Sequence, residues 1–332
     1  MAVVVVPLGI VQAGIETVPG TAVAATRVVD MEGGNAKLIT DQEPILVANA
    51  GSLASGHRAY AGPYKARVEF SDMPANYDDL PWWLNFFCTP VTSGTGAGAD
   101  KTYTQLPHDT ADDAKRATLE IGGKDTWASE FKLAGCSGRK LDISIKRDGL
   151  WRMSSTLLGT LLTKASKTAA LSARTVQHIV AAGTKVYLDS ASAFGTTQLV
   201  GRLISADVSI ENGLIQREPV DGNPSDGLAP AALVLTDRRK VTAKVVATFD
   251  AITEFDAWRT AAVQRLRLKQ IGPTLGASNY SAQLDIGGAW KSFGLGDADG
   301  IVTAEMELTG LYDSAIAADW RSVVVNAQGT LV

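Results

Sequence analysis

Alternating hydrophobic and polar residues predict a strand followed by a short helix near residue 64. The segment YKARVEF, residues 64–70, places apolar side chains at every second position, which is the period of a half-buried strand. Asn76 then stands as a helix N-cap, with Asp79 three residues later near the helix start. The apolar residues of the helix recur at the spacing of one helical face. This stripe, which we expect in the structural core, is Leu80, Trp83, Leu84 and Phe87.

The same pattern occurs again in the second half of the chain. Residues 241–247 alternate like a strand, and Thr253 and Asp256 repeat the cap and the acid at one common offset from Asn76 and Asp79. The apolar stripe of this second helix, predicted over 253–269 and also assigned to the core, is Phe255, Trp258, Ala262 and Leu266.

Short motifs flank both helices in the same order. LEIGG at residues 119–123 matches LDIGG at 284–288, so Gly122, Gly123, Gly287 and Gly288 mark a repeated strand motif. Upstream, Leu38-Ile39 before Glu43-Pro44 matches Leu214-Ile215 before Glu218-Pro219. Matches in the same order predict an internal duplication of a hairpin, strand, helix and strand unit. The alternative is that the two halves converged on similar amphipathic patterns.

The chain of 332 residues is long enough for about two domains. The predicted class is mainly β with short flanking helices, a sandwich or barrel-like fold that is internally duplicated. The predicted divisions are an N-terminal arm (1–30), a first β domain (31–160) with a long loop (89–115), a linker (161–184), a second β domain (185–313) and a C-terminal segment (314–332). Turn signals at Asp148-Gly149 and Asn212-Gly213 predict hairpins.

Candidate catalytic chemistry is sparse. The three histidines, His57, His108 and His178, share no spacing with acids or cysteines, whereas a zinc site needs clustered ligands. The run Asp297-x-Asp299-Gly300 lacks the other ligands of a calcium loop, and a hairpin turn is the better interpretation. We therefore expect no enzyme, no cofactor and no metal.

Charge and cysteine content limit the functional classes to which the protein can belong. The formal net charge is -4, without the basic surplus of a protein that grips nucleic acid phosphates. Cys88 and Cys136 do not have the spacing of a redox pair, and either two free thiols or a disulfide between them is compatible with the sequence. No run approaches the ~20 apolar residues of a transmembrane helix, so no membrane partner is expected.

Several stretches resemble the tail tube (major tail) proteins of long-tailed bacteriophages. The matching stretches are Glu16–Ala22, Gly62–Val68 before a short helix, the Thr/Gly-rich loop with Tyr103 and His108, Leu119–Gly123, and Gly135–Ile143 before an Asp-Gly turn. Together they span residues 16–310 and consist mainly of turn and strand chemistry.

This resemblance implies a virion structural protein that assembles in the host bacterial cytoplasm. Such proteins associate with themselves as rings that stack into a tube. The rings are expected here as trimers with pseudo-sixfold symmetry, and six chains per ring is the rival arrangement. The implied partners are the tape-measure, tail-terminator and tail-tip proteins, with DNA only in passage through the lumen. The candidate ring-to-ring loop residues are Thr92, Gly94, Gly96, Tyr103 and His108. The alternative class is a β-rich binding module, such as an adhesin or carbohydrate-binding domain, which would need exposed aromatic platforms.

Overall fold

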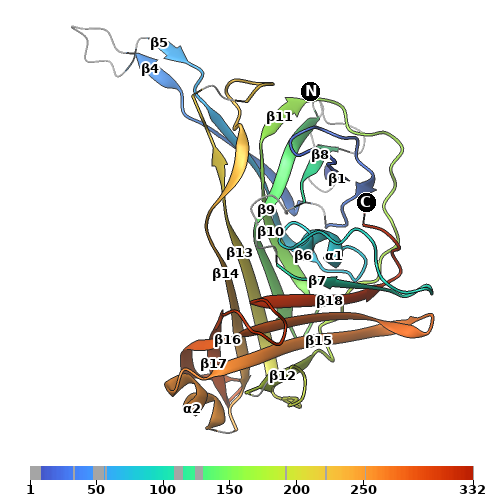
Figure 1. Ribbon diagram of the computed structural model, residues 1–332, viewed down its shortest axis with the longest axis vertical. Helices are drawn as coiled ribbons and strands as arrows, with labels where there is room; N and C mark the ends of the chain where they lie inside the picture. The colour runs from blue at the N-terminus through green and yellow to red at the C-terminus, as the bar shows by residue number, and fades with distance from the viewer. Residues whose placement is uncertain are drawn as a thin grey trace.

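The protein is mainly β, which confirms the predicted fold class. The computed structural model describes residues 9–32, 34–47, 56, 58–107, 115–123, 130–190, 193–220, 223–250 and 252–331. Within these ranges there are 18 strands and two short helices, and every pair of neighbouring strands is antiparallel (Figure 1).

The first half of the chain holds twelve strands or helices. In order they are β1 (Gly9–Ile15), β2 (Arg27–Val28), β3 (Ala36–Gln42), β4 (Ile45–Val47), β5 (Arg58–Tyr60), β6 (Tyr64–Pro74), α1 (Leu80–Leu84), β7 (Lys101–Gln105), β8 (Ala117–Gly123), β9 (Phe131–Lys146), β10 (Arg152–Gly159) and β11 (Leu161–Lys164).

The second half holds eight. They are β12 (Lys185–Asp189), β13 (Leu203–Arg217), β14 (Ala232–Thr248), α2 (Thr253–Arg259), β15 (Val263–Leu275), β16 (Ser278–Ala298), β17 (Ile301–Gly310) and β18 (Trp320–Asn326).

Both halves have the same strand-pairing network. In the first half the order is β3-β6-β10-β9-β8-β1, and β11 pairs with the start of β9. In the second half the order is β13-β14-β17-β16-β15-β12, and β18 pairs with the start of β16. A helix follows β6 in one half and β14 in the other. The chain therefore contains two copies of one seven-stranded unit, which we call copy 1 and copy 2.

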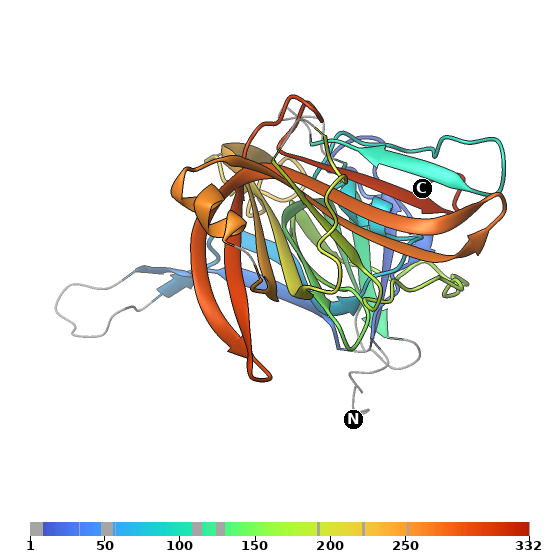
Figure 2. The same cartoon turned by 90° about the horizontal axis from the view of Figure 1, so that it is seen from below.

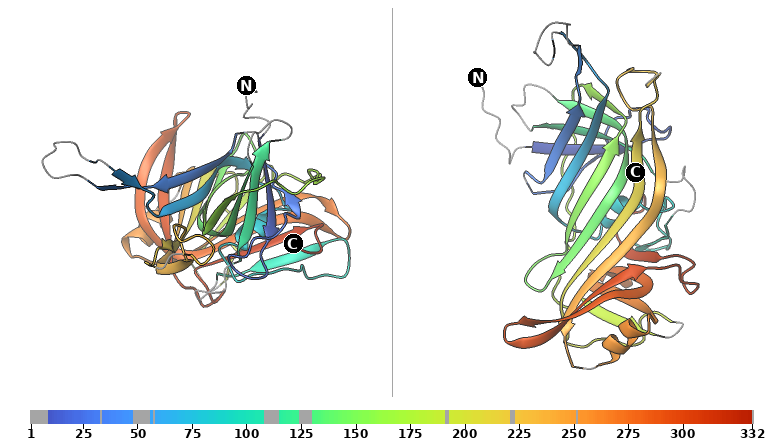
Figure 3. Two further views of the ribbon diagram at one scale, coloured as in Figure 1. Left: turned by 90° about the horizontal axis from the view of Figure 1, so that it is seen from above. Right: turned by 90° about the vertical axis from the view of Figure 1, so that its left-hand side faces the viewer.

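The two copies share one continuous sheet. Residues 140–146 of β9 pair with residues 205–211 of β13, and we call this pairing the seam. Figure 3 shows the long strands of both copies side by side across the seam. A second link joins the copies, because β7 of copy 1 pairs with β18 of copy 2. Alternating apolar residues on β6, β9, β13, β14 and β17 all face a common core.

Helix α1 lies inside that core. Pro81 occupies the first turn, where its missing N–H removes no helical hydrogen bond. The backbone N–H of Asp79 is bound by the Asn76 side chain at 2.6 Å. Trp82, which the stripe leaves off the core face, is nevertheless 1% exposed and has the Arg27 guanidinium 5.1 Å from its ring centroid. A helix that is surrounded on all sides has no solvent face, so Trp82 is enclosed although it lies off the apolar stripe.

Helix α2 ends earlier than predicted. It stops at Arg259, Ala261 has a φ of 50°, and β15 begins at Val263. Residues 263–270 alternate buried and half-buried or exposed side chains, so their two-residue period gives a strand where a helix was predicted. Leu266 is buried, but it lies on this strand and not on a helix.

Two predicted turns differ in outcome. Asp299 and Gly300 form the two-residue turn between β16 and β17, both with positive φ, which confirms a hairpin at this place. Asn212-Gly213 is not a hairpin, because β13 continues through it with an irregular register. The Asn212 side chain is buried there and donates to the Gly138 carbonyl at 3.2 Å, a tertiary contact in place of the exposed turn that the dipeptide predicts.

Candidate assembly surfaces

Several stretches of the sheet have a strand on one side only among the described residues, and two of them are long stretches in different copies. β3 pairs with β6 alone, and residues 290–298 of β16 pair with β17 alone. The end of the β16–β17 hairpin projects from the body in Figures 2 and 3. Exposed edges of this kind offer unpaired backbone N–H and C=O groups to another chain.

A second exposed feature is the β4–β5 hairpin of copy 1. It forms a separate two-stranded sheet that extends away from the body at one end of the molecule (Figures 1 and 2). Ile45, Leu46 and Tyr60 are 54%, 53% and 53% exposed. Contiguous exposed apolar residues of this kind mark a protein contact surface. Sequence reasoning missed this surface, although ILV at 45–47 is an apolar run that no neighbouring amphipathic pattern explains.

A third feature is the aromatic group around α2. Phe255, Trp258 and Phe293 lie with ring centroids 5.6 to 6.5 Å apart. Trp258 is 36% exposed and Phe255 is half-buried, so the prediction that Trp258 belongs to the core is wrong. The reason is positional, because α2 lies at the border of copy 2 beside β16, whereas α1 is enclosed (Figure 1).

The predicted core residues in and around α1 are buried. Trp83, Leu84 and Phe87 are at most 1% exposed. Trp83 makes edge-to-face contacts with Phe70 at 4.9 Å and with Trp82 at 5.0 Å. Trp151 and Trp290 are also buried, and Trp127 lies outside the described residues. Trp83, Trp151 and Trp290 therefore provide no exposed platform for a sugar.

The predicted ring-to-ring loop is held against the body over much of its length. Thr92 and Gly96 are exposed and Gly94 is half-buried. Tyr103 is fully buried on β7, and its hydroxyl donates to the Gln328 carbonyl at 2.8 Å. Tyr103 is thus unable to contact another ring, because the alternation of β7 turns its side chain inward against β18. His108 lies outside the described residues.

The repeated Gly-Gly motif falls on strands that are not equivalent. Gly122 and Gly123 end β8, whereas Gly287 and Gly288 lie within β16. In the shared pairing network β8 corresponds to β15, and β16 corresponds to β9. The match between LEIGG and LDIGG was therefore wrong as a repeat marker, although the duplication itself is visible in the strand pairing.

Both acids of these motifs form buried ion pairs. Glu120 accepts from Lys132 Nζ at 2.7 Å, and Asp285 accepts from Arg267 Nε and Arg321 Nη2, each at 2.6 Å. Both carboxylates are 0% exposed. Each pair joins neighbouring strands of the sheet, so these charges have a structural role.

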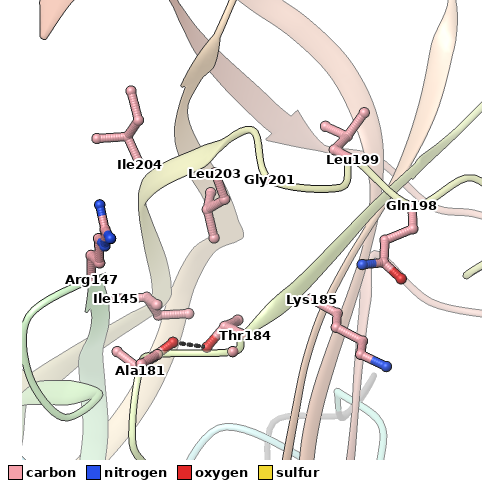
Figure 4. A pocket seen from close by; sticks show the side chains of 12 residues that line it. Ile145, Arg147, Ala181, Thr184, Lys185, Gln198, Leu199, Gly201, Leu203 and Ile204 are labelled. Atoms are coloured by element: carbon pink, nitrogen blue, oxygen red, sulfur yellow. Dashed lines mark hydrogen bonds between the residues drawn. The ribbon is translucent and has the colours of Figure 1, made fainter.

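Features of an enzyme site are weak in the described part of the chain. The cavity in Figure 4, about 580 Å³, lies between β9, β13 and the segment 181–185, and no Asp, Glu, His or Cys is among the described residues that line it. No group of three or more such side chains within the described ranges could hold a metal ion. His178 Nε2 lies 3.1 Å from Asp30 Oδ2, which also accepts a hydrogen bond from Asn76 Nδ2 at 3.1 Å. Cys88 and Cys136 are free, and burial raises the pKa of both thiols. Neither described helix is long and apolar enough to span a membrane.

The fold is a duplicated β sheet with open strand edges, the kind of edge that can pair with another chain. The profile of the phage tail tube protein family matches residues 8–310 of this chain. The chain belongs to that family and is a structural component of a bacteriophage tail. Membership implies a non-enzymatic role. No curated protein matches the chain.

Proposed function

We propose that copies of this chain close into rings, and that the rings stack into the tube through which the phage delivers its DNA. The observation that carries the proposal is the continuous sheet through two copies of one unit, with open strand edges in copy 1 and in copy 2. A sheet of repeated units leaves no open edge only when it closes on itself. Each copy would form one wall segment. Copy 1 consists of the predicted domain 31–160 together with β1 and β11, and copy 2 consists of the predicted domain 185–313 together with β18.

Three chains per ring give six wall segments. The pairing network of copy 2 matches that of copy 1 strand for strand, which supports equivalent positions for both in the wall. The rival arrangement has six chains per ring, with copy 2 outside the wall. Contacts with tape-measure, tail-terminator and tail-tip proteins belong to the same proposal, as does assembly in the host cytoplasm.

We assign the polar face of the shared sheet to the lumen. This face carries the side chains that point away from the core on β6, β9, β13, β14 and β17. Several of its cations are held by carboxylates of the same face. The pairs are Arg67 with Asp41 and with Glu69 at 2.9 Å, Lys140 with Asp142 at 2.9 Å, Lys244 with Glu305 at 3.7 Å and Lys291 with Glu307 at 2.8 Å. Neutralised cations bind phosphate weakly, so DNA could slide past them.

Electron microscopy of the concentrated protein tests the proposal. Tubes whose rings contain three chains and six similar lobes are expected. Rings of six chains with copy 2 as an outer shell would reject the three-chain arrangement. Monomers that bind glycans and form no tubes would favour the binding-module alternative and reject the proposal altogether.

The β4–β5 hairpin supplies a contact between neighbouring chains in this proposal. Leu46→Asp places a charge on its exposed apolar surface and should shorten or abolish tubes while the chain still folds. Val200→Asp is the matched control, because Val200 is 73% exposed and lies elsewhere. Equal tube lengths for both variants would remove the hairpin from the assembly contacts.

A further inference from the structure

The two copies can be aligned residue by residue through a bulge that both contain. In the pairing of β9 with β10 the register shifts at Arg139, between Gly138 and Lys140. In the pairing of β16 with β17 it shifts at Lys291, between Trp290 and Ser292. A bulge is a fixed feature of strand geometry, so it anchors the alignment without any sequence similarity.

Register then carries the alignment across the sheet. The residues that follow the bulge on the partner strands are Leu157 and Leu308, which are therefore equivalent. Leu157 lies opposite Val68, which lies opposite Leu38. Leu308 lies opposite Ala243, which lies opposite Val208. Leu38 of copy 1 is thus equivalent to Val208 of copy 2. Ile143 lies four residues after the bulge at Arg139, and Leu295 lies four residues after the bulge at Lys291. Ile143 is therefore equivalent to Leu295.

The seam within the chain shows how such positions are buried when a neighbouring strand pairs with them. Ile143 of copy 1 lies opposite Val208 of copy 2, and both are 1% exposed. The equivalent pair in the reverse direction, Leu295 of copy 2 and Leu38 of copy 1, belongs to the two open edges of the same chain. Leu295 is 61% exposed and Leu38 is half-buried. Ile143, the equivalent of Leu295, is buried because it pairs across the seam. Leu295 has no such partner among the described residues of the chain and therefore stays exposed.

We propose that each open edge is completed by a second copy of this chain, in the register of the seam. Residues 292–298 of β16 pair antiparallel with residues 35–41 of the next chain, with Leu295 opposite Leu38 and Gly294 opposite Ile39. The contact is heterologous, because two different edges meet, and it repeats from chain to chain until the ring closes. This inference rests on the proposed function, since it specifies the interface of the proposed ring.

A disulfide tests the register directly. Directly opposite residues of antiparallel strands have Cα atoms about 4.5–5.5 Å apart, within the range that a disulfide spans. Gly294 accepts a side chain, because the nearest atom to an added Cβ is the Glu305 carbonyl oxygen at 4.0 Å. The variant Ile39→Cys with Gly294→Cys should therefore cross-link neighbouring chains under mild oxidation. Cys88 and Cys136 are fully buried and should not contribute.

Two matched controls shift the register by two residues on the same face of β3. They combine Gly294→Cys with Lys37→Cys or with Asp41→Cys, positions about 7–8 Å away diagonally. We expect strong linkage only in the first variant, with covalent species that stop at three chains on a non-reducing gel.

The outcomes separate this inference from the proposed function. Tubes without linkage between positions 39 and 294, or with linkage only in a control, overturn the pairing while the tube proposal stands. Linkage that stops at six chains supports the pairing and overturns the three-chain ring. Failure of the unaltered protein to form rings or tubes at any concentration, together with no linkage, overturns both.

Discussion

Ile143 of β9 and Val208 of β13 lie directly opposite each other across the seam, and each is 1% exposed. Their contact joins the cores of the two copies, so the copies share one hydrophobic core as well as one sheet. Separation of the copies would expose this apolar surface, which makes the seam a stable part of the fold.

Equivalent positions in the two copies should respond differently to truncation. Ile143→Ala should lower the free energy of unfolding by about 2–5 kcal/mol, because it leaves a cavity in the core. Leu295→Ala should change it by less than about 0.5 kcal/mol in the single chain, since that side chain is mostly exposed. Urea unfolding of the unassembled protein measures both. Equal losses would contradict the assignment of Leu295 to an unfilled interface.

The two helix tryptophans should also differ. Trp83→Ala should cost about 3–5 kcal/mol of unfolding free energy, the usual range for a buried aromatic. Trp258→Ala should cost about 1 kcal/mol, because a 36% exposed ring loses less burial and leaves no closed cavity. Thermal or urea unfolding of the two variants side by side decides the point. A Trp258→Ala loss as large as that of Trp83→Ala would mean that α2 is enclosed like α1.

Asp285 should be essential to stability because of the two arginines that it binds. Asp285→Ala leaves Arg267 and Arg321 near each other without their shared carboxylate and should cost about 3–5 kcal/mol. Asp256→Ala, which removes an exposed pair with Arg259 at 3.8 Å, is the control and should cost less than about 1 kcal/mol. Urea unfolding at low and high salt checks both, and a strong salt dependence at Asp285 would argue against its burial.

Alkaline pH should reveal the buried Tyr77. Burial raises the pKa of Tyr77 to about 12, whereas an unfolded tyrosine has a pKa of about 10. Below pH 10 the Tyr77 hydroxyl is protonated in both the folded and the unfolded protein, and its contribution to stability is complete. Between pH 10 and pH 12 the hydroxyl loses its proton in the unfolded protein before it does so in the folded protein, which favours unfolding. Stability should therefore fall by about 2–3 kcal/mol across this window.

The variant Tyr77→Phe isolates that contribution. The difference in unfolding free energy between the unaltered protein and Tyr77→Phe should shrink as the pH rises from 10 to 12. Tyr312→Phe, at a 73% exposed position, is the matched control. A difference for Tyr77→Phe that stays constant with pH would show that the phenol is solvated in the folded state.

Local sequence patterns determined much of the secondary structure. The two-residue alternation at 64–70 and 241–247 lies on β6 and β14, and the Asp299-Gly300 turn lies where its chemistry requires positive φ. These features depend on near neighbours in the chain, whose sterics and burial period are visible in the sequence. The failed prediction of a helix to residue 269 has the same origin, because apolar residues at 255, 258, 262 and 266 fit a helix while 264–270 fit a strand.

Only the tertiary structure decided which residues are buried and which strands correspond. Trp83 and Trp258 both belong to the apolar stripe of a predicted helix, yet one is enclosed by the core and the other lies at the border of copy 2. LEIGG and LDIGG are nearly identical, yet they occupy strands that are not equivalent. Pairing between distant strands depends on the register of the whole sheet, which no local window contains. The sequence by itself determined the class, and its two strand-and-helix patterns predicted a repeat. The fold determined the alignment of the repeat and its open edges, because both arise from contacts between residues far apart in the chain.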